Sequence, residues 1–172
     1  MIIFNYNHKT IPMRIAYLHG LESDNLGKKN DWLHANYIVY DPLINYKERG
    51  IFAKVLRELS AFKPDLIVGS SMGGYFAYEM AKIINKPMLL LNPALHARSM
   101  QPDVPSSIRG SANPKMHCIL GVKDSVVNPK ETIKFLNREY SQRKWTYDYQ
   151  PHAHRTPFEV YKTEVTKFLS RL

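Results

Sequence analysis

Short apolar stretches alternate with helical patterns along most of this chain. The predicted strands are Met13–Leu18, Tyr37–Tyr40, Asp65–Val68, Pro87–Leu91, Met116–Leu120 and Lys144–Tyr149. The first five are apolar almost throughout, as expected of strands whose two faces are both covered by helices. The sixth alternates between polar and apolar residues and suits the edge of a sheet. Strands that alternate with helices predict an α/β fold with a mainly parallel sheet.

Helical spacing is clearest in four segments. Apolar residues in Ile51–Phe62 recur with the period of an amphipathic helix, and Met72–Ile84 is apolar nearly all round, which predicts a buried helix. Asn128 followed by Pro129 is a typical helix start, with Asn as the N-cap and Pro in the first turn. The segment Phe158–Leu169 predicts a final helix with one apolar face.

Length and composition predict one domain covering residues 1–172. A hydrophobic content of 44% is too high for a disordered chain. No apolar run approaches the roughly 20 residues that span a bilayer, and the N-terminus lacks the basic start of a signal peptide. A single cysteine, Cys118, forbids an internal disulfide and fits a reducing compartment. We therefore expect a cytoplasmic domain with no stable membrane association.

The net charge of +9 raises the question of an anionic partner. The basic residues are scattered, and no basic run is longer than Lys28-Lys29. No helix-turn-helix, zinc-finger or aromatic RNA-binding pattern accompanies them, so we expect no nucleic-acid partner. Lys28, Lys29, Arg98 and Arg109 are predicted to lie in loops, where they could attract an anionic substrate. The oligomeric state is left open.

Ser71 is the strongest candidate for a reactive group. It is the serine of Gly69-Ser-Ser-Met-Gly73, a G-x-S-x-G pattern that follows a predicted strand and precedes a predicted helix. A tight turn of this kind exposes the serine hydroxyl at the carboxyl end of the sheet. The pattern lacks the spacing of a phosphate-binding loop. We therefore interpret Ser71 as a nucleophile.

A nucleophilic serine needs a base and an acid that orients it. Asp124 follows the strand that ends at Leu120, and it is the predicted acid; Asp148 is a weaker rival because it lies within a strand. The predicted base is His154, which follows the next strand. His152 is the alternative base, because residues two apart in an extended segment can face the same side.

A site for acyl transfer also needs two N–H groups that stabilise an oxyanion. The amide of Met72 follows the nucleophile, and the amide of Leu21 follows the first strand, so these two are predicted. His19 is expected to brace that loop. The pair of histidines at 152 and 154 lacks a third ligand at a convincing spacing, so no metal site is predicted. His34, His96 and His117 are interpreted as structural or surface residues.

Four segments of the chain resemble the small YqiA-type esterases of the α/β-hydrolase superfamily. They are LHGL at residues 18–21, GSSMGGYFA at 69–77, LNPA at 91–94 and HRTPFE at 154–159. The resemblance implies a single α/β-hydrolase domain that cleaves carboxylic esters, or acyl thioesters such as acyl-CoA, without a cofactor. It implies a triad of Ser71, Asp124 and His154.

The resemblance leaves the substrate and the reaction partly open. The loop predicted from His96 to Pro114 stands where larger hydrolases insert a cap, and its roughly 20 residues are too few for one. We therefore expect a minimal domain without a cap and a small-molecule ester or thioester as substrate. A peptidase or C–C hydrolase would use the same triad. A non-catalytic binding protein with this fold is the alternative from another class.

Overall fold

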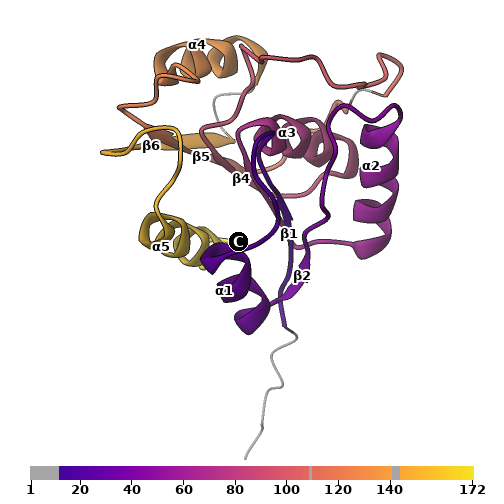
Figure 1. Ribbon diagram of the computed structural model, residues 1–172, viewed down its shortest axis with the longest axis horizontal. Coiled ribbons are helices and arrows are strands. Elements are labelled where there is room, and N and C mark those ends of the chain that lie inside the picture. Colours follow the sequence, from indigo (N-terminus) through magenta and orange to yellow (C-terminus); the bar gives the residue numbers. More distant parts are fainter. Residues whose placement is uncertain (1–11, 109, 141–143) are drawn as a thin grey trace, which may run out of the picture.

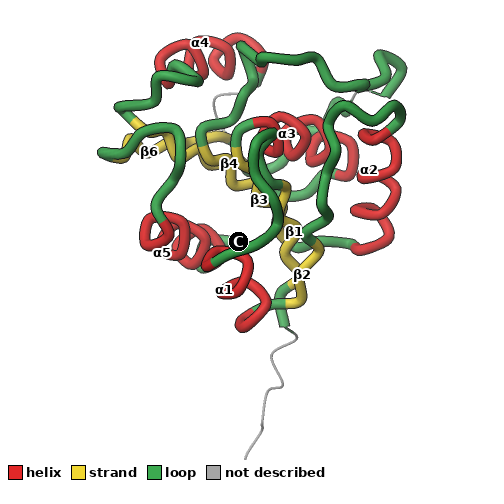
Figure 2. Tube along the Cα trace, viewed as in Figure 1, coloured by secondary structure: helices red, strands yellow, loops and turns green. Residues whose placement is uncertain are grey.

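A six-stranded, fully parallel sheet forms the centre of the fold (Figures 1 and 2). The computed structural model describes residues 12–108, 110–140 and 144–172. The strands are β1 (Arg14–Leu18), β2 (Ile38–Tyr40), β3 (Leu66–Ser70), β4 (Met88–Leu91), β5 (Met116–Gly121) and β6 (Trp145–Gln150). Their order across the sheet is β2-β1-β3-β4-β5-β6, so β6 is an edge strand. The six predicted strands and the parallel α/β fold are therefore confirmed.

Helices cover both faces of this sheet (Figure 1). They are α1 (Lys28–Asn36), α2 (Ile51–Phe62), α3 (Met72–Ile84), α4 (Pro129–Glu139) and α5 (Phe158–Leu169). Helices α2, α3 and α4 pack on one face, and α1 and α5 pack on the other. Four of these helices were predicted. The Asn128 side chain accepts a hydrogen bond from the amide of Lys130, as expected of an N-cap.

Helix α1 was not predicted, and its sequence explains why. KKNDWLHAN has no apolar stripe, and Leu33 is its one fully buried apolar residue. Lys28 and Lys29 are the first two residues of this helix, so the prediction that they lie in a loop is wrong. Packing against the rest of the domain, and not an amphipathic pattern, stabilises α1.

Alternation along the strands divides the core between the two faces. In β1, Ala16 and Leu18 belong to the cluster under α2, α3 and α4, whereas Ile15 and Tyr17 belong to the cluster under α1 and α5. This is the period of two expected of a strand. All four side chains are buried, which is why the strands appear as continuous apolar runs in the sequence.

The described residues of the connection from β4 to β5 form turns but neither a helix nor a strand. This agrees with the long loop predicted from His96 to Pro114 and with a fold that carries no cap there. In the part of the chain that the structure describes, no helix has the length and apolarity required to cross a bilayer. Residues 1–11 of the predicted domain lie outside the described ranges.

The topology creates a crevice at the carboxyl ends of β1 and β3. The chain leaves β1 for α1 on one face of the sheet, and it leaves the neighbouring β3 for α3 on the other face. Ligands of open parallel sheets bind where neighbouring connections diverge in this way. Leu21 follows β1 and Ser71 follows β3, so both lie at this crevice.

Candidate active site

Ser71 occupies a strained turn between β3 and α3. Its backbone has φ 53° and ψ −116°, a conformation that residues with a side chain rarely adopt and that costs about 1–3 kcal/mol. Hydrogen bonds hold this conformation: its amide donates to the carbonyl of Leu91 over 3.0 Å, and its carbonyl accepts from Ala94 over 3.0 Å and from Tyr75 over 3.2 Å. Hydrogen bonds to the surrounding backbone therefore maintain the strained conformation of Ser71.

Glycines on both sides of Ser71 permit this turn. A Cβ on Gly69 would lie 2.4 Å from the carbonyl oxygen of Gly73, and a Cβ on Gly73 would lie 2.0 Å from that of Leu18. Larger residues would therefore push α3 away from the sheet. Gly20, in the loop after β1, has a φ outside the left-handed region. A Cβ there would stand 3.3 Å from the Cβ of Ser71, so Gly20 leaves room beside the serine.

Ser71, His154 and Asp124 form a continuous hydrogen-bonded chain. His154 Nε2 lies 2.9 Å from Ser71 Oγ, and His154 Nδ1 lies 2.8 Å from Asp124 Oδ2. The Asp124 carboxylate is completely buried, whereas 22% of the His154 side chain is exposed. The structure therefore brings together the three residues predicted as nucleophile, acid and base. In this arrangement Nδ1–H donates to the carboxylate and Nε2 can accept the serine proton.

The loop after β5 fixes the Asp124 carboxylate from its other side. Its Oδ1 atom accepts hydrogen bonds from the amides of Val126 and Val127, over 2.8 and 2.9 Å. One oxygen is thus held by backbone, and the other is left for the imidazole. Asp148, the weaker rival, points elsewhere: it lies on β6 and bonds to Lys167 over 3.0 Å.

Asn92, directly after β4, connects the loops that carry the acid and the base. Its Nδ2 donates to the carbonyl of His154 over 2.7 Å and to that of Ala153 over 3.3 Å, while its Oδ1 accepts from the amide of Gly121 over 2.7 Å. Asn92 is buried and has φ 43°. In the sequence, Asn92 was noted only as part of the LNPA segment, with no predicted role. A polar residue directly after a buried strand was the signal that could have revealed its role.

His152 does not face Ser71. Its Nδ1 lies 2.7 Å from the carbonyl oxygen of Ala153, and its buried Nε2 has no hydrogen-bond partner among the described residues. The ring packs against Gly121, where a Cβ would come within 2.8 Å of Nδ1. Of the two candidate bases, the structure brings His154 to the serine and leaves His152 buried behind the loop.

Leu21 and Met72, whose amides are the predicted oxyanion donors, belong to the loop after β1 and to the start of α3. Met72 is the first residue of α3, so its N–H has no acceptor within the helix. Leu21 follows β1 and lines the same cleft as Ser71. His19 braces this loop as expected: its Nδ1 lies 2.7 Å from the carbonyl oxygen of Gly20, and its Nε2 accepts from the amide of Ile44 over 2.8 Å. The loop that carries Leu21 is thus fixed from two sides.

Ser71 and His154 open into a cleft of about 710 Å³. Lys28, Lys29 and Arg155 line it together with apolar and acidic side chains. The pKa of Lys29 is lowered, first by burial and then by the positive charge of Arg155. The cleft therefore contains cations whose mutual repulsion an anionic ligand would relieve.

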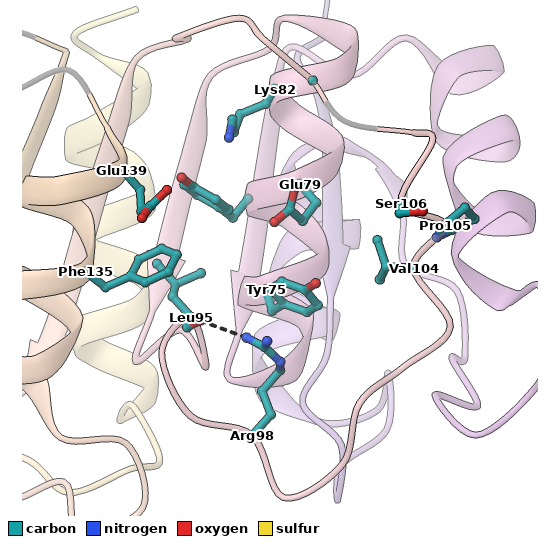
Figure 3. Close-up of a pocket in the computed structure, with 12 residues that line it drawn as sticks. Tyr75, Glu79, Lys82, Leu95, Arg98, Val104, Pro105, Ser106, Phe135 and Glu139 are labelled. Carbon is teal, nitrogen blue, oxygen red and sulfur yellow. Dashed lines mark hydrogen bonds between the residues drawn. The ribbon is translucent and has the colours of Figure 1, made fainter.

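Arg98 lies in a loop, as predicted, but this loop position is not at the Ser71 cleft. It lines a second cavity of about 370 Å³ together with Tyr75 and Leu95 (Figure 3). Its guanidinium stands 4.0 Å from the centre of the Tyr75 ring and donates to the carbonyl of Leu95 over 2.8 Å. These contacts give it a structural role, and it does not line the Ser71 cleft. Arg109 lies outside the described residues.

Residues 14–117 match the sequence profile described as "Uncharacterised protein family (UPF0227)". The chain belongs to this family. The match confirms the resemblance to YqiA-type members of the α/β-hydrolase superfamily. It covers Ser71 and the LNPA segment of this UPF0227 protein and ends before Asp124 and His154. A sequence comparison with curated proteins gave no match.

Solved structures with the same fold align with nearly the whole UPF0227 chain. A member of the alpha/beta superfamily from Xanthomonas campestris pv. campestris has a TM-score of 0.72 at 16% identity, with 93% of this chain and 99% of that chain covered. Est1E from Butyrivibrio proteoclasticus, also known with bound ferulic acid, has a TM-score of 0.73 at 13% identity, with 96% and 90% covered.

A third similar structure is the RedJ thioesterase of the prodiginine biosynthetic pathway in Streptomyces coelicolor. Its TM-score is 0.65 at 11% identity, with 92% of this chain and 86% of that chain covered. At these identities the likeness concerns the fold. The UPF0227 protein thus has an α/β-hydrolase fold that resembles those of esterases and thioesterases.

Proposed function

We propose that this protein is a serine esterase that hydrolyses carboxylic esters through an acyl-enzyme. The observation that carries the proposal is the hydrogen-bonded chain from Ser71 through His154 to the buried Asp124, at the wall of an open cleft. The strained backbone of Ser71 supports it, because such strain concentrates at functional sites.

In the proposed mechanism, His154 Nε2 takes the proton of the Ser71 hydroxyl while Oγ attacks the acyl carbon. The Nδ1–H bond to Asp124 fixes the tautomer and stabilises the imidazolium that forms. The amides of Leu21 and Met72 stabilise the oxyanion, each by about 3–4 kcal/mol. His154 then protonates the leaving alcohol or thiol. Water, activated by the same imidazole, releases the acid and restores Ser71.

The cleft supports a small-molecule substrate. Its volume of about 710 Å³ lies within the range of small-molecule sites, and the connection from β4 to β5 contributes no cap. Lys28, Lys29 and Arg155 favour substrates that carry an anionic group, which include acyl thioesters such as acyl-CoA. The proposed chemistry requires no cofactor, and we place the enzyme in the cytoplasm.

Active-site labelling tests this proposal directly. A fluorophosphonate probe is expected to label the wild-type protein and not Ser71→Ala, and the same variant is expected to lose hydrolysis of p-nitrophenyl esters. Ser60→Ala is the matched control, because Ser60 is exposed on α2 and bonds within its own helix. Equal labelling of the wild type and Ser71→Ala would refute the nucleophile. Turnover of an ester by Ser71→Ala at the wild-type rate would refute the mechanism.

A further inference from the structure

A second group of ionisable side chains lies away from the cleft, on the face of the sheet that α5 covers. His117 comes from β5, Asp148 from the neighbouring β6 and Glu164 from α5. His117 Nε2 lies 3.5 Å from Asp148 Oδ2 and 3.9 Å from Glu164 Oε2. One ligand atom from each residue fits within 4.8 Å of the others. Three potential metal ligands therefore converge on one point.

The Nε2 atom of His117 faces the two carboxylates without forming a hydrogen bond within the described residues. Its side chain is 3% exposed, and its buried Nε2 has no partner among the described residues. The ring is fixed by Thr146, whose Oγ1 lies 2.7 Å from Nδ1, and by stacking on Phe168. When Nδ1–H donates to the Thr146 hydroxyl, the Nε2 lone pair faces the two carboxylates. A buried nitrogen in this state lacks a partner that a cation would supply.

The chemistry of these three side chains suits a metal ion. A neutral imidazole with two carboxylates is a donor set typical of zinc and similar divalent ions. The Thr146 hydroxyl at Nδ1 corresponds to the outer hydrogen bond that orients most metal-binding histidines.

The two distances from His117 Nε2 to the carboxylates are close to the spacing of zinc ligands. Bonds of 2.0–2.2 Å in a tetrahedral site place ligand atoms about 3.3–3.6 Å apart. The distances from His117 Nε2, 3.5 and 3.9 Å, need only a small inward movement. Asp148 and Lys167 are about 40% exposed, so solvent reaches the group from this side.

Lys167 competes for the same carboxylates. Its Nζ lies 3.0 Å from Asp148 Oδ2 and 3.5 Å from Glu164 Oε2, where it neutralises both but gives Nε2 no bond. Its long, partly exposed side chain can turn outward when another cation binds. We propose that His117, Asp148 and Glu164 form a binding site for a divalent metal ion of the zinc type, in which Lys167 is an internal competitor.

Isothermal titration of the full-length, chelator-treated protein with ZnCl₂ tests the site. We expect one ion per chain, with affinity at least about tenfold weaker in His117→Gln and in Glu164→Gln. Lys167→Met is expected to bind more tightly than the wild type, because it removes the competing ammonium. His34→Ala is the matched control, since His34 also pairs with a carboxylate, at 3.0 Å from Asp41, but on the surface. Its affinity should be unchanged.

Cobalt substitution supplies a readout that a structural role would not change. Co²⁺ should give the visible absorption of a tetrahedral site in the wild type and in Lys167→Met, and not in Glu164→Gln. Failure of Lys167→Met to bind either ion would overturn the proposal. Equal affinities in the wild type, His117→Gln and Glu164→Gln would overturn it too, since another site would then hold the metal. If His117→Gln does not fold, Lys167→Met and Glu164→Gln decide the question.

Discussion

His154 and His117 both lie beside buried or partly buried carboxylates, and their surroundings differ in almost every other respect. At the cleft, His154 meets Asp124 over 2.8 Å and remains 22% exposed. Under α5, His117 stands 3.5 and 3.9 Å from Asp148 and Glu164 and is 3% exposed. Nε2 of His154 meets the Ser71 hydroxyl, whereas Nε2 of His117 has no hydrogen-bond partner in the described part of the chain.

The partners of the carboxylates explain this contrast. Asp124 accepts from two backbone amides and the imidazole, so its negative charge acts on His154. The carboxylates near His117 share their charge with Lys167. An acid beside a histidine is therefore not enough to make a general base. The ring also needs a nucleophile on its second nitrogen and access to substrate.

The largest expected effect tests whether activity belongs to the cleft alone. His154→Ala should lower kcat for p-nitrophenyl butyrate by about 10³–10⁴-fold, because the serine loses its base. His117→Gln should leave kcat within about threefold, since its ring has no contact with the cleft. Steady-state kinetics on both variants measures the difference. A loss of kcat in His117→Gln as large as that in His154→Ala would show that activity does not depend on the cleft alone.

His152→Ala serves as the control nearest in sequence to His154. Its ring is buried behind the loop and bonds to the carbonyl of Ala153, so its removal should reduce stability more than kcat. A loss of kcat in His152→Ala as large as that in His154→Ala would reverse the assignment of the base. Circular dichroism on each variant separates a lost fold from a lost base.

A smaller effect is expected from Asn92, which holds the loop of His154. Asn92→Gly tolerates φ 43° but removes the hydrogen bonds to His154, Ala153 and Gly121. We expect kcat to fall about 10–100-fold with little change in KM, because a misplaced base affects the chemical step more than binding. Asn92→Asp keeps the acceptor for Gly121 and loses the donors, so it should resemble Asn92→Gly in kcat. If Asn92→Asp keeps full activity, the positioning role is wrong.

Local patterns predicted most of the fold and part of the site. The strands were found because buried parallel strands are continuous apolar runs, and Ser71 because its turn needs glycines within a few residues. Asp124 was found because it follows a buried strand. Helix α1 was missed because tertiary packing and not its own sequence selects it.

Features that depend on contacts between distant segments could not be predicted. His152 and His154 have the same position in an extended loop pattern, and hydrogen bonds from distant residues such as Asn92 and Asp124 hold His154 toward Ser71. His117, Asp148 and Glu164 come from three elements with no motif spacing, and β5–β6 register brings the first two together. Lys28 and Lys29 were predicted in a loop and instead begin α1, yet they still line the cleft.

The smallest expected effect is the contribution of His117 to the pH dependence of folding. Burial lowers its pKa below the ordinary 6.5 in the folded protein, so the unfolded chain binds the proton first as the pH falls. Stability is therefore highest above pH 6.5 and is lost as the pH decreases below it. Between pH 6.5 and 5.5 the loss from this group is at most about 1.4 kcal/mol.

Urea unfolding of the wild type and His117→Gln at pH 7.5 and 5.5 measures this contribution. His117→Gln should lose less unfolding free energy over this interval than the wild type, since glutamine binds no proton. Lys167 lowers the pKa of Asp148, so the contribution of Asp148 to the unfolding free energy is lost only at more acidic pH. Asp148 therefore does not titrate between pH 7.5 and 5.5. If His117→Gln instead loses more unfolding free energy than the wild type, folding raises the pKa of His117, and its carboxylates act as ion-pair partners. Equal losses would mean that folding leaves the pKa of His117 unshifted, which also contradicts the prediction.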